Sequence, residues 1–116
     1  MSLIRKPVFV AIAATLLAQP VLAQESPTLK KIKDSGTIAL GHRESSIPFS
    51  YYDDKQQVVG YSQELMLKVV DAVKAELKMP NLQLKLTPVT SQNRIPLVQN
   101  GTVDIECGST THNAER

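Results

Sequence analysis

The sequence lacks several patterns that mark common classes of protein. It has a single cysteine, and its two histidines are scattered, so no set of side chains has the spacing of metal ligands. No histidine, pair of carboxylates or activated nucleophile stands in an arrangement that suggests catalysis. With 42% apolar and 21% charged residues, the chain has the composition of an ordinary globular protein, not of a disordered or collagen-like one. We therefore expect no cofactor, no metal and no enzymatic activity.

The sequence also lacks an apolar run long enough to cross a membrane. Residues 8–17 are apolar, and a bilayer needs roughly 20 such residues. A basic start at Arg5 and Lys6 and a small-residue end at Ala23 instead predict a secretory signal peptide over residues 1–23, cleaved before Gln24. A retained anchor is the alternative, and the short apolar run disfavours it. Export predicts a location in the oxidising bacterial periplasm.

Charge of one sign is not in excess either. Without Arg5 and Lys6, the 13 basic residues fall to 11, which equals the 11 acidic residues. A balanced chain gives no support for nucleic acid or an anionic membrane as a partner.

The mature part of the sequence alternates between strand and helix patterns. A capped helix is expected from Ser26 to Gly36, with Lys30, Lys31 and Lys33 on its solvent face. A polar interval at residues 53–57 predicts a hairpin between residues 48–52 and 58–61. Strands are expected at residues 37–40, 82–87 and 103–107. A helix over residues 63–77, capped by Ser62, separates the first two, and a short helix capped by Asn93 and closed by Gly101 separates the last two. Strands that alternate with helices in this way favour a parallel sheet.

Candidate binding residues follow each of the three expected strands. Arg43 follows the first, Ser91 and Arg94 the second, and Ser109 and Thr111 the third. Ligands of open parallel sheets bind beyond the carboxyl ends of the strands, and arginine forks and hydroxyls suit a carboxylate. Taken singly, each residue has an ordinary reading: Arg43 could pair on the surface with Glu44 or Asp53, Arg94 could be a solvated first-turn residue, and the hydroxyls could be turn residues. Their joint placement favours a small-molecule site.

Several stretches in this order resemble a known family. They read LGHR at residues 40–43, PFSYYD at 48–53, VGYSQE at 59–64 and TSQNRIPLVQNGTVDIECGSTT at 90–111. The chain thus resembles the extracellular solute-binding proteins of amino-acid ABC transporters, family 3, and within them the glutamate/aspartate-binding branch. The resemblance implies a two-lobe α/β fold of the type II periplasmic binding proteins. Residues 24–116 would then be the N-terminal part of an incomplete first lobe with a parallel sheet.

The resemblance also assigns roles to the candidate residues. In similar proteins the positions matching Ser109, Thr111 and Arg116 hold the ligand's α-carboxylate. Those matching Arg43, Ser91 and Arg94 grip the side-chain carboxylate in the glutamate/aspartate branch. The implied partners are L-glutamate or L-aspartate and the membrane subunits of an ABC importer, with a monomer expected for the full-length protein.

Two alternatives to this function, and two readings of the cysteine, stay open. The same fold serves enzymes, such as periplasmic dehydratases or lytic transglycosylases, for which only Glu44 and Glu115 lie near the expected cleft as carboxylates. It also serves ligand-sensing domains of receptors. Cys107 is either a small buried residue of its strand or, as the family suggests, the partner of a cysteine outside this sequence.

Overall fold

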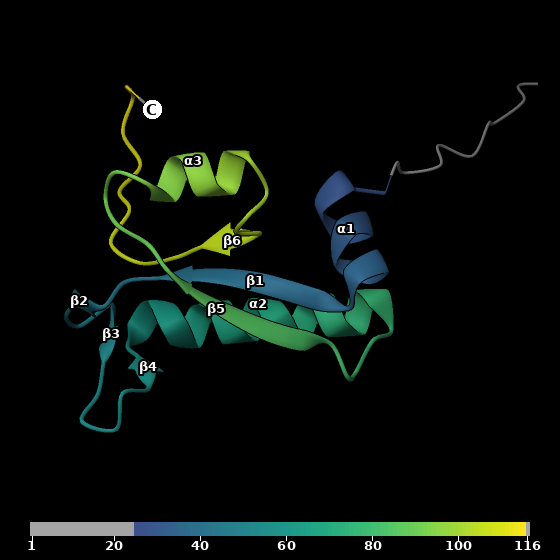
Figure 1. Ribbon diagram of the computed structural model, residues 1–116, viewed down its shortest axis with the longest axis horizontal. Helices are drawn as coiled ribbons and strands as arrows, with labels where there is room; N and C mark the ends of the chain where they lie inside the picture. The colour runs from purple at the N-terminus through teal and green to yellow at the C-terminus, as the bar shows by residue number, and fades with distance from the viewer. Residues whose placement is uncertain (1–24, 116) are drawn as a thin grey trace, which may run out of the picture.

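The computed structural model describes residues 25–115 as a parallel sheet with helices on either side and, at one end, a second sheet of three short antiparallel strands within residues 45–59, here called the hairpin unit (Figure 1). The expected signal peptide and Arg116 lie outside the described residues. The elements are α1 (Pro27–Ser35), β1 (Thr37–His42), β2 (Ser45–Ser46), β3 (Ser50–Tyr52), β4 (Val58–Val59), α2 (Tyr61–Leu77), β5 (Gln83–Pro88), α3 (Arg94–Gln99) and β6 (Ile105–Glu106).

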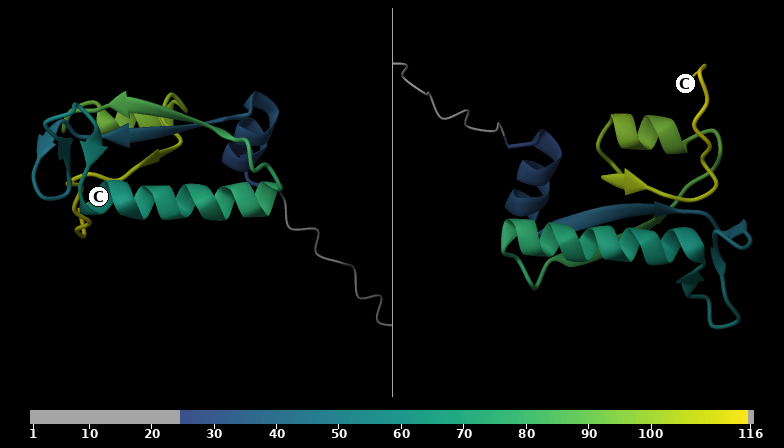
Figure 2. Two further views of the ribbon diagram at one scale, coloured as in Figure 1. Left: turned by 90° about the horizontal axis from the view of Figure 1, so that it is seen from below. Right: turned by 180° about the vertical axis from the view of Figure 1, so that it is seen from behind.

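The main sheet has the order β5-β1-β6, and both pairs of strands are parallel. Helix α2 runs along one face of β1, and α3 lies next to β6 on the side away from α2 (Figure 2). This arrangement confirms the parallel α/β architecture that the alternation of elements predicts. All three carboxyl ends therefore point the same way, toward the hairpin unit.

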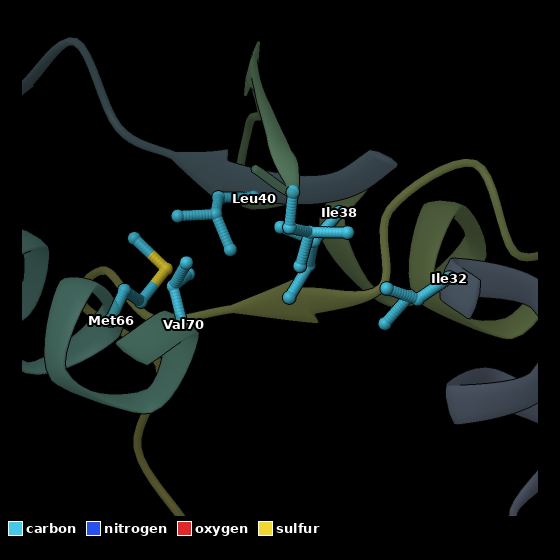
Figure 3. Packing of buried hydrophobic residues seen from close by; sticks show 6 residues of the cluster. Ile32, Ile38, Leu40, Met66 and Val70 are labelled. Carbon is cyan, nitrogen blue, oxygen red and sulfur yellow. The ribbon is translucent and has the colours of Figure 1, made fainter. Parts of the chain in front are cut away.

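The core lies between α1, α2 and the face of β1 that carries Ile38 and Leu40 (Figure 3). Met66 and Val70, one helical turn apart on α2, are at most 3% exposed, as their spacing predicts. The helical spacing of Met66, Val69, Val70, Val73 and Leu77 also predicts Val69 on this apolar stripe, but Val69 is 42% exposed. Its position is one residue, about 100° of helix, away from Val70, which turns it off the sheet.

Strand β5 is less buried than its alternating pattern predicts. Leu84 and Leu86 pair with Ile38 and Leu40 in register, so they share the core face of the sheet. Each is nevertheless 40% exposed, because β5 is an edge strand and α2 packs over β1. Only Leu82, just before the strand, is fully inside the core.

The first two helices begin differently from expectation. Ser26 precedes α1, but its side chain makes no capping hydrogen bond. Helix α2 begins at Tyr61 after Gly60, two residues earlier than a Ser62 cap would require. Gly60 has φ 119°, and a methyl group there would lie 2.4 Å from the carbonyl oxygen of Phe49, so only glycine fits this chain reversal. Ser62 is thereby freed for a different contact.

Lys31 is not simply a solvated residue of α1. Its Nζ lies 2.7 Å from Oδ1 of Asp104, whose side chain is 4% exposed, and it also donates to the carbonyl oxygen of Gly101. Oδ2 of Asp104 accepts the backbone N–H of Ala39 at 2.8 Å. The segment before β6 is thus tied to both α1 and β1.

Candidate functional site

The candidate site lies where the three parallel strands end. Arg43 follows β1, Ser91 follows β5 and Ser109 follows β6, so the fold gathers at one edge residues that are far apart in sequence. Figure 1 shows the three connecting segments beside the hairpin of β3 and β4. The site predicted from the sequence requires that the three strands be parallel and end side by side, and the sheet topology meets this requirement.

Arg43 makes a specific contact with the end of β5. Its Nη1 donates to Oγ of Ser91 at 2.8 Å, across 48 residues of sequence. The surface ion pair with Glu44 or Asp53 is not formed, and Asp53 Oδ1 instead accepts the backbone N–H groups of Lys55 and Gln57 in the hairpin turn. The structure thus brings together two of the predicted residues.

Gly108 brings the end of β6 against Arg43. A methyl group at Gly108 would lie 2.7 Å from Cγ of Arg43 and 2.9 Å from Oε1 of Glu106, so these two side chains already fill the space beside the glycine. The carbonyl oxygen of Gly108 accepts a hydrogen bond of 2.8 Å from Oγ of Ser62. Ser62 therefore fixes the loop after β6 to the first turn of α2.

Ser109 and Thr111 line a surface hollow of about 370 Å³ that Phe49 and His112 also border. Residues of the loop after β6 and Phe49, which precedes β3, line this hollow together. Both predicted residues of this loop therefore face a concave surface next to Gly108. Arg116, predicted for the same group of ligand atoms, lies outside the described residues.

Arg94 is placed differently from a solvated first-turn residue. It is the first residue of α3, is 7% exposed, and its Nε is buried without a hydrogen-bond partner. It lines a second hollow, also of about 370 Å³, together with Glu106 of β6. Among the described residues, no hydrogen bond joins the Arg94 side chain to Arg43 or Ser91. Glu106 thus shares a hollow with Arg94 and also lies, with Arg43, beside Gly108.

Known proteins share much of this sequence. Residues 38–116 match the family model described as bacterial extracellular solute-binding proteins, family 3. The chain belongs to this family. Curated relatives include an L-glutamate/L-aspartate-binding protein of Pseudomonas aeruginosa, 63% identical over 91% of this chain, and a glutamate/aspartate import solute-binding protein of Escherichia coli, 55% identical over 97%. The chain spans 36% and 39% of the length of these relatives.

Solved structures show the same fold. An ancestral amino-acid-binding protein, described as a precursor of cyclohexadienyl dehydratase, is 29% identical with a TM-score of 0.60. The match covers 77% of this chain and 36% of that one. The predicted fold, part of a type II periplasmic binding protein, is confirmed for the described part of this solute-binding chain.

Ser50 is a residue of the site region that the sequence interpretation missed. Its Oγ accepts the backbone N–H of Arg43 at 2.8 Å and donates to the Arg43 carbonyl oxygen at 3.3 Å, and the residue is fully buried. The ring of His42 packs edge-on against Tyr52 with a centroid distance of 5.5 Å. Residues of the hairpin therefore contact both the last residue of β1, His42, and the residue after it, Arg43. A serine within the apolar run PFSYY was the available signal.

Glu106 was also missed. Its Oε2 accepts a hydrogen bond of 2.7 Å from Oγ1 of Thr110, and its Oε1 is buried without a partner. It is one of two acidic residues, with Asp104, in the otherwise apolar strand pattern VDIECG. An acidic side chain at that position of a buried strand needs a reason, and this was the signal available.

Cys107 is a free thiol that is partly buried and packs against the core. This burial agrees with the first reading of the residue, and pairing with a cysteine elsewhere stays a prediction. Within residues 25–115, no group of three or more histidine, cysteine or acidic side chains could hold a metal ion. In the same described part, no helix is long and apolar enough to cross a membrane.

Proposed function

We propose that this chain is part of a periplasmic receptor that binds L-glutamate or L-aspartate and delivers it to the membrane subunits of an ABC importer. The two curated relatives bind or import these amino acids according to their names, and they match this chain at 55% and 63% identity. Residues 1–23 would direct its export. The enzyme alternative has one structural neighbour, named as a dehydratase precursor, in its favour. Against it stand the much higher identities of the transport relatives.

The hydrogen bond between Arg43 and Ser91 is the observation that carries this proposal. It holds a guanidinium at the common end of β1 and β5, where its remaining N–H groups can meet a carboxylate. In the proposed complex, Arg43, Ser91 and Arg94 bind the side-chain carboxylate. Ser109, Thr111 and Arg116 bind the α-carboxylate that every amino acid carries.

Ligand discrimination tests these roles in the full-length protein that carries this chain. An amide presents one oxygen and two donors to the arginines, so glutamine should bind more weakly than glutamate by at least about 2 kcal/mol, or about thirtyfold. Isothermal titration calorimetry with both amino acids measures this ratio. Equal affinities in the unmodified protein would contradict the assignment of Arg43 and Arg94.

Variants separate the two ends of the ligand. Arg43→Met should erase most of the preference for glutamate, because the fork that favours a second carboxylate is lost. Arg43→Lys is the matched control: it keeps the charge but not the bidentate geometry, so part of the preference should remain. Arg116→Met should weaken glutamate and glutamine by the same factor, since both carry the α-carboxylate.

A further inference from the structure

The side chain of Glu106 is directed to the face of the sheet that carries α3. In the parallel register Gly41 pairs with Glu106 on one side and with Thr87 on the other, so these three positions lie level across the sheet. Register partners in a sheet project to the same face. A methyl group at Gly41 would lie 3.3 Å from Cγ of Glu106, so the glutamate stem leans over the glycine.

The two carboxylate oxygens of Glu106 have different surroundings. Oε2 is bound by the Thr110 hydroxyl at 2.7 Å, whereas Oε1 is buried without a hydrogen-bond partner. A buried carboxylate oxygen is costly unless a donor or an opposite charge compensates it. The stem of Arg43 reaches the same place from β1, because Arg43 Cγ and Glu106 Oε1 together fill the space beside Gly108.

Arg94 has a buried hydrogen-bond donor without a partner, as Glu106 has a buried acceptor without one. Its side chain is 7% exposed, and its Nε–H is buried without an acceptor. Arg94 and Glu106 line the same hollow, between α3 and β6. The second carboxylate of that hollow, Asp104, is already occupied by Lys31 and by the backbone of Ala39. Among the described acidic groups lining this hollow, Glu106 alone has an oxygen without a hydrogen-bond partner. Arg94 and Glu106 form no ion pair within 4.0 Å, so their opposite charges can act on each other only across the hollow.

We propose that Glu106 is a positioning residue that compensates the charge of Arg94 in the ligand-free protein and thereby limits how strongly the site prefers an acidic ligand. The ligand's side-chain carboxylate must compete with Glu106 for the arginine. If residue 106 is neutral, Arg94 depends on the ligand for its counter-charge, and a neutral ligand cannot supply one. The effect on ligand choice rests on the proposed function, whereas the pairing of the two side chains does not.

A double-mutant cycle in the full-length protein tests the pairing without any ligand. Glu106→Gln keeps the size of the side chain and an acceptor for Thr110, and Arg94→Met removes the charge. Each single variant leaves one buried charge uncompensated, so the double variant should be more stable than the summed single effects, by at least tenfold in the unfolding equilibrium constant. Chemical unfolding measures this coupling. Strict additivity would overturn the proposal.

A control pair and a replacement variant accompany the double-mutant cycle. Thr110→Val combined with Arg94→Met should be additive, because the threonine bonds to the other oxygen of Glu106. Coupling of equal size in that pair would show a general loosening of the loop and would overturn the proposal. Should Arg94→Met fail to fold, Arg94→Gln replaces it, since its polar side chain suits the hollow better.

Ligand titration tests the second half of the proposal. In Glu106→Gln the ratio of glutamate to glutamine affinity should rise about tenfold over the unmodified protein, mostly through weaker binding of glutamine. A residue with a merely structural role would lower both affinities together. An unchanged or smaller ratio overturns the effect on ligand choice. If the unmodified protein binds neither glutamate nor aspartate, the proposed function fails, and the cycle still decides whether Glu106 pairs with Arg94.

Discussion

Asp104 and Glu106 stand two residues apart at the end of the sequence and differ in how their carboxylates are satisfied. Both oxygens of Asp104 have partners, one at 2.7 Å on Lys31 and one at 2.8 Å on Ala39. Glu106 has one oxygen bound by Thr110 and one buried without a partner. The difference follows their positions, because Asp104 joins β1 and α1 at the entry to β6, while Glu106 faces the strand ends.

The two carboxylates therefore have different roles: one holds segments of the chain together, and the other lies close to the candidate site. Asp104 is fully compensated within the fold, as expected for a carboxylate that fixes one segment to another. Glu106, with Arg94 and Thr87 Oγ1, belongs to a group of incompletely satisfied atoms close to the candidate site. Unsatisfied buried polar groups are costly and persist where they serve a purpose. The comparison therefore predicts that changes at Asp104 act on stability, and that changes around Glu106 act on binding.

The largest expected effect is that of Asp104→Ala on stability. The variant leaves the buried N–H of Ala39 without an acceptor and Lys31 without its partner, so the free energy of unfolding should fall by about 3 kcal/mol. Lys31→Met isolates the ion pair: it leaves the carboxylate of Asp104, whose side chain is 4% exposed, with only the N–H of Ala39, and should cost about 2 kcal/mol, less than Asp104→Ala. Urea unfolding measures both. Equal losses would mean that the bond to Ala39 contributes little.

A smaller effect, mainly on binding, is expected for Gly108→Ala. The added methyl group would lie 2.7 Å from Arg43 Cγ and 2.9 Å from Glu106 Oε1, so at least one of these side chains must move. Glutamate affinity should fall about tenfold, or 1.4 kcal/mol. Gly36→Ala is the matched control: its φ of 68° disfavours alanine by about 1 kcal/mol in stability, while no atom crowds the new methyl. If Gly36→Ala bound glutamate more weakly than Gly108→Ala, crowding beside Gly108 would not be the cause of the weaker binding.

The smallest effect is expected at the exposed pair of Lys30 and Asp34. A hydrogen bond to Asp34, 2.6 Å long, together with its charge, raises the pKa of Lys30 above the ordinary lysine value. The stabilisation is therefore present below the pKa of the unfolded chain and is lost as the pH rises through the folded pKa. Asp34→Asn should lower the Lys30 pKa, which an NMR titration of the ammonium group detects. Stability at neutral pH should barely change, because both side chains are more than 60% exposed.

The parallel sheet and the positions of the strand ends could be predicted from the sequence because both depend on local patterns. Apolar runs and the helical spacing of Met66 and Val70 identify the elements, and their order implies the crossovers. Exposure on β5 could not be predicted in this way. Leu84 has the pattern of a half-buried strand, but its 40% exposure depends on which strand lies at the edge of the sheet.

At the site, the residue types were predictable and their partners were not. Arg43 and Ser91 were expected at neighbouring strand ends, and they form a hydrogen bond. Ser62 reads locally as a helix cap, yet Gly60 begins the helix and Ser62 binds the loop after β6. Glu106 has no local signature beyond its polarity, because its role depends on a register with Gly41 and on Arg94, twelve residues earlier in the chain. Long-range contacts of this kind override local preference.

The ion pair of Lys31 and Asp104 has a consequence for the order in which the chain can fold. It joins positions 73 residues apart, and the bond from Ala39 to Asp104 joins positions 65 apart. During synthesis, β1 emerges long before β5 and β6, its two neighbours in the sheet, have been made. Closing loops of this length costs entropy before the contacts reward it, so such contacts slow folding. Strand β1 can therefore gain its first sheet neighbour only after residue 88 has been made, and its second only after residue 106.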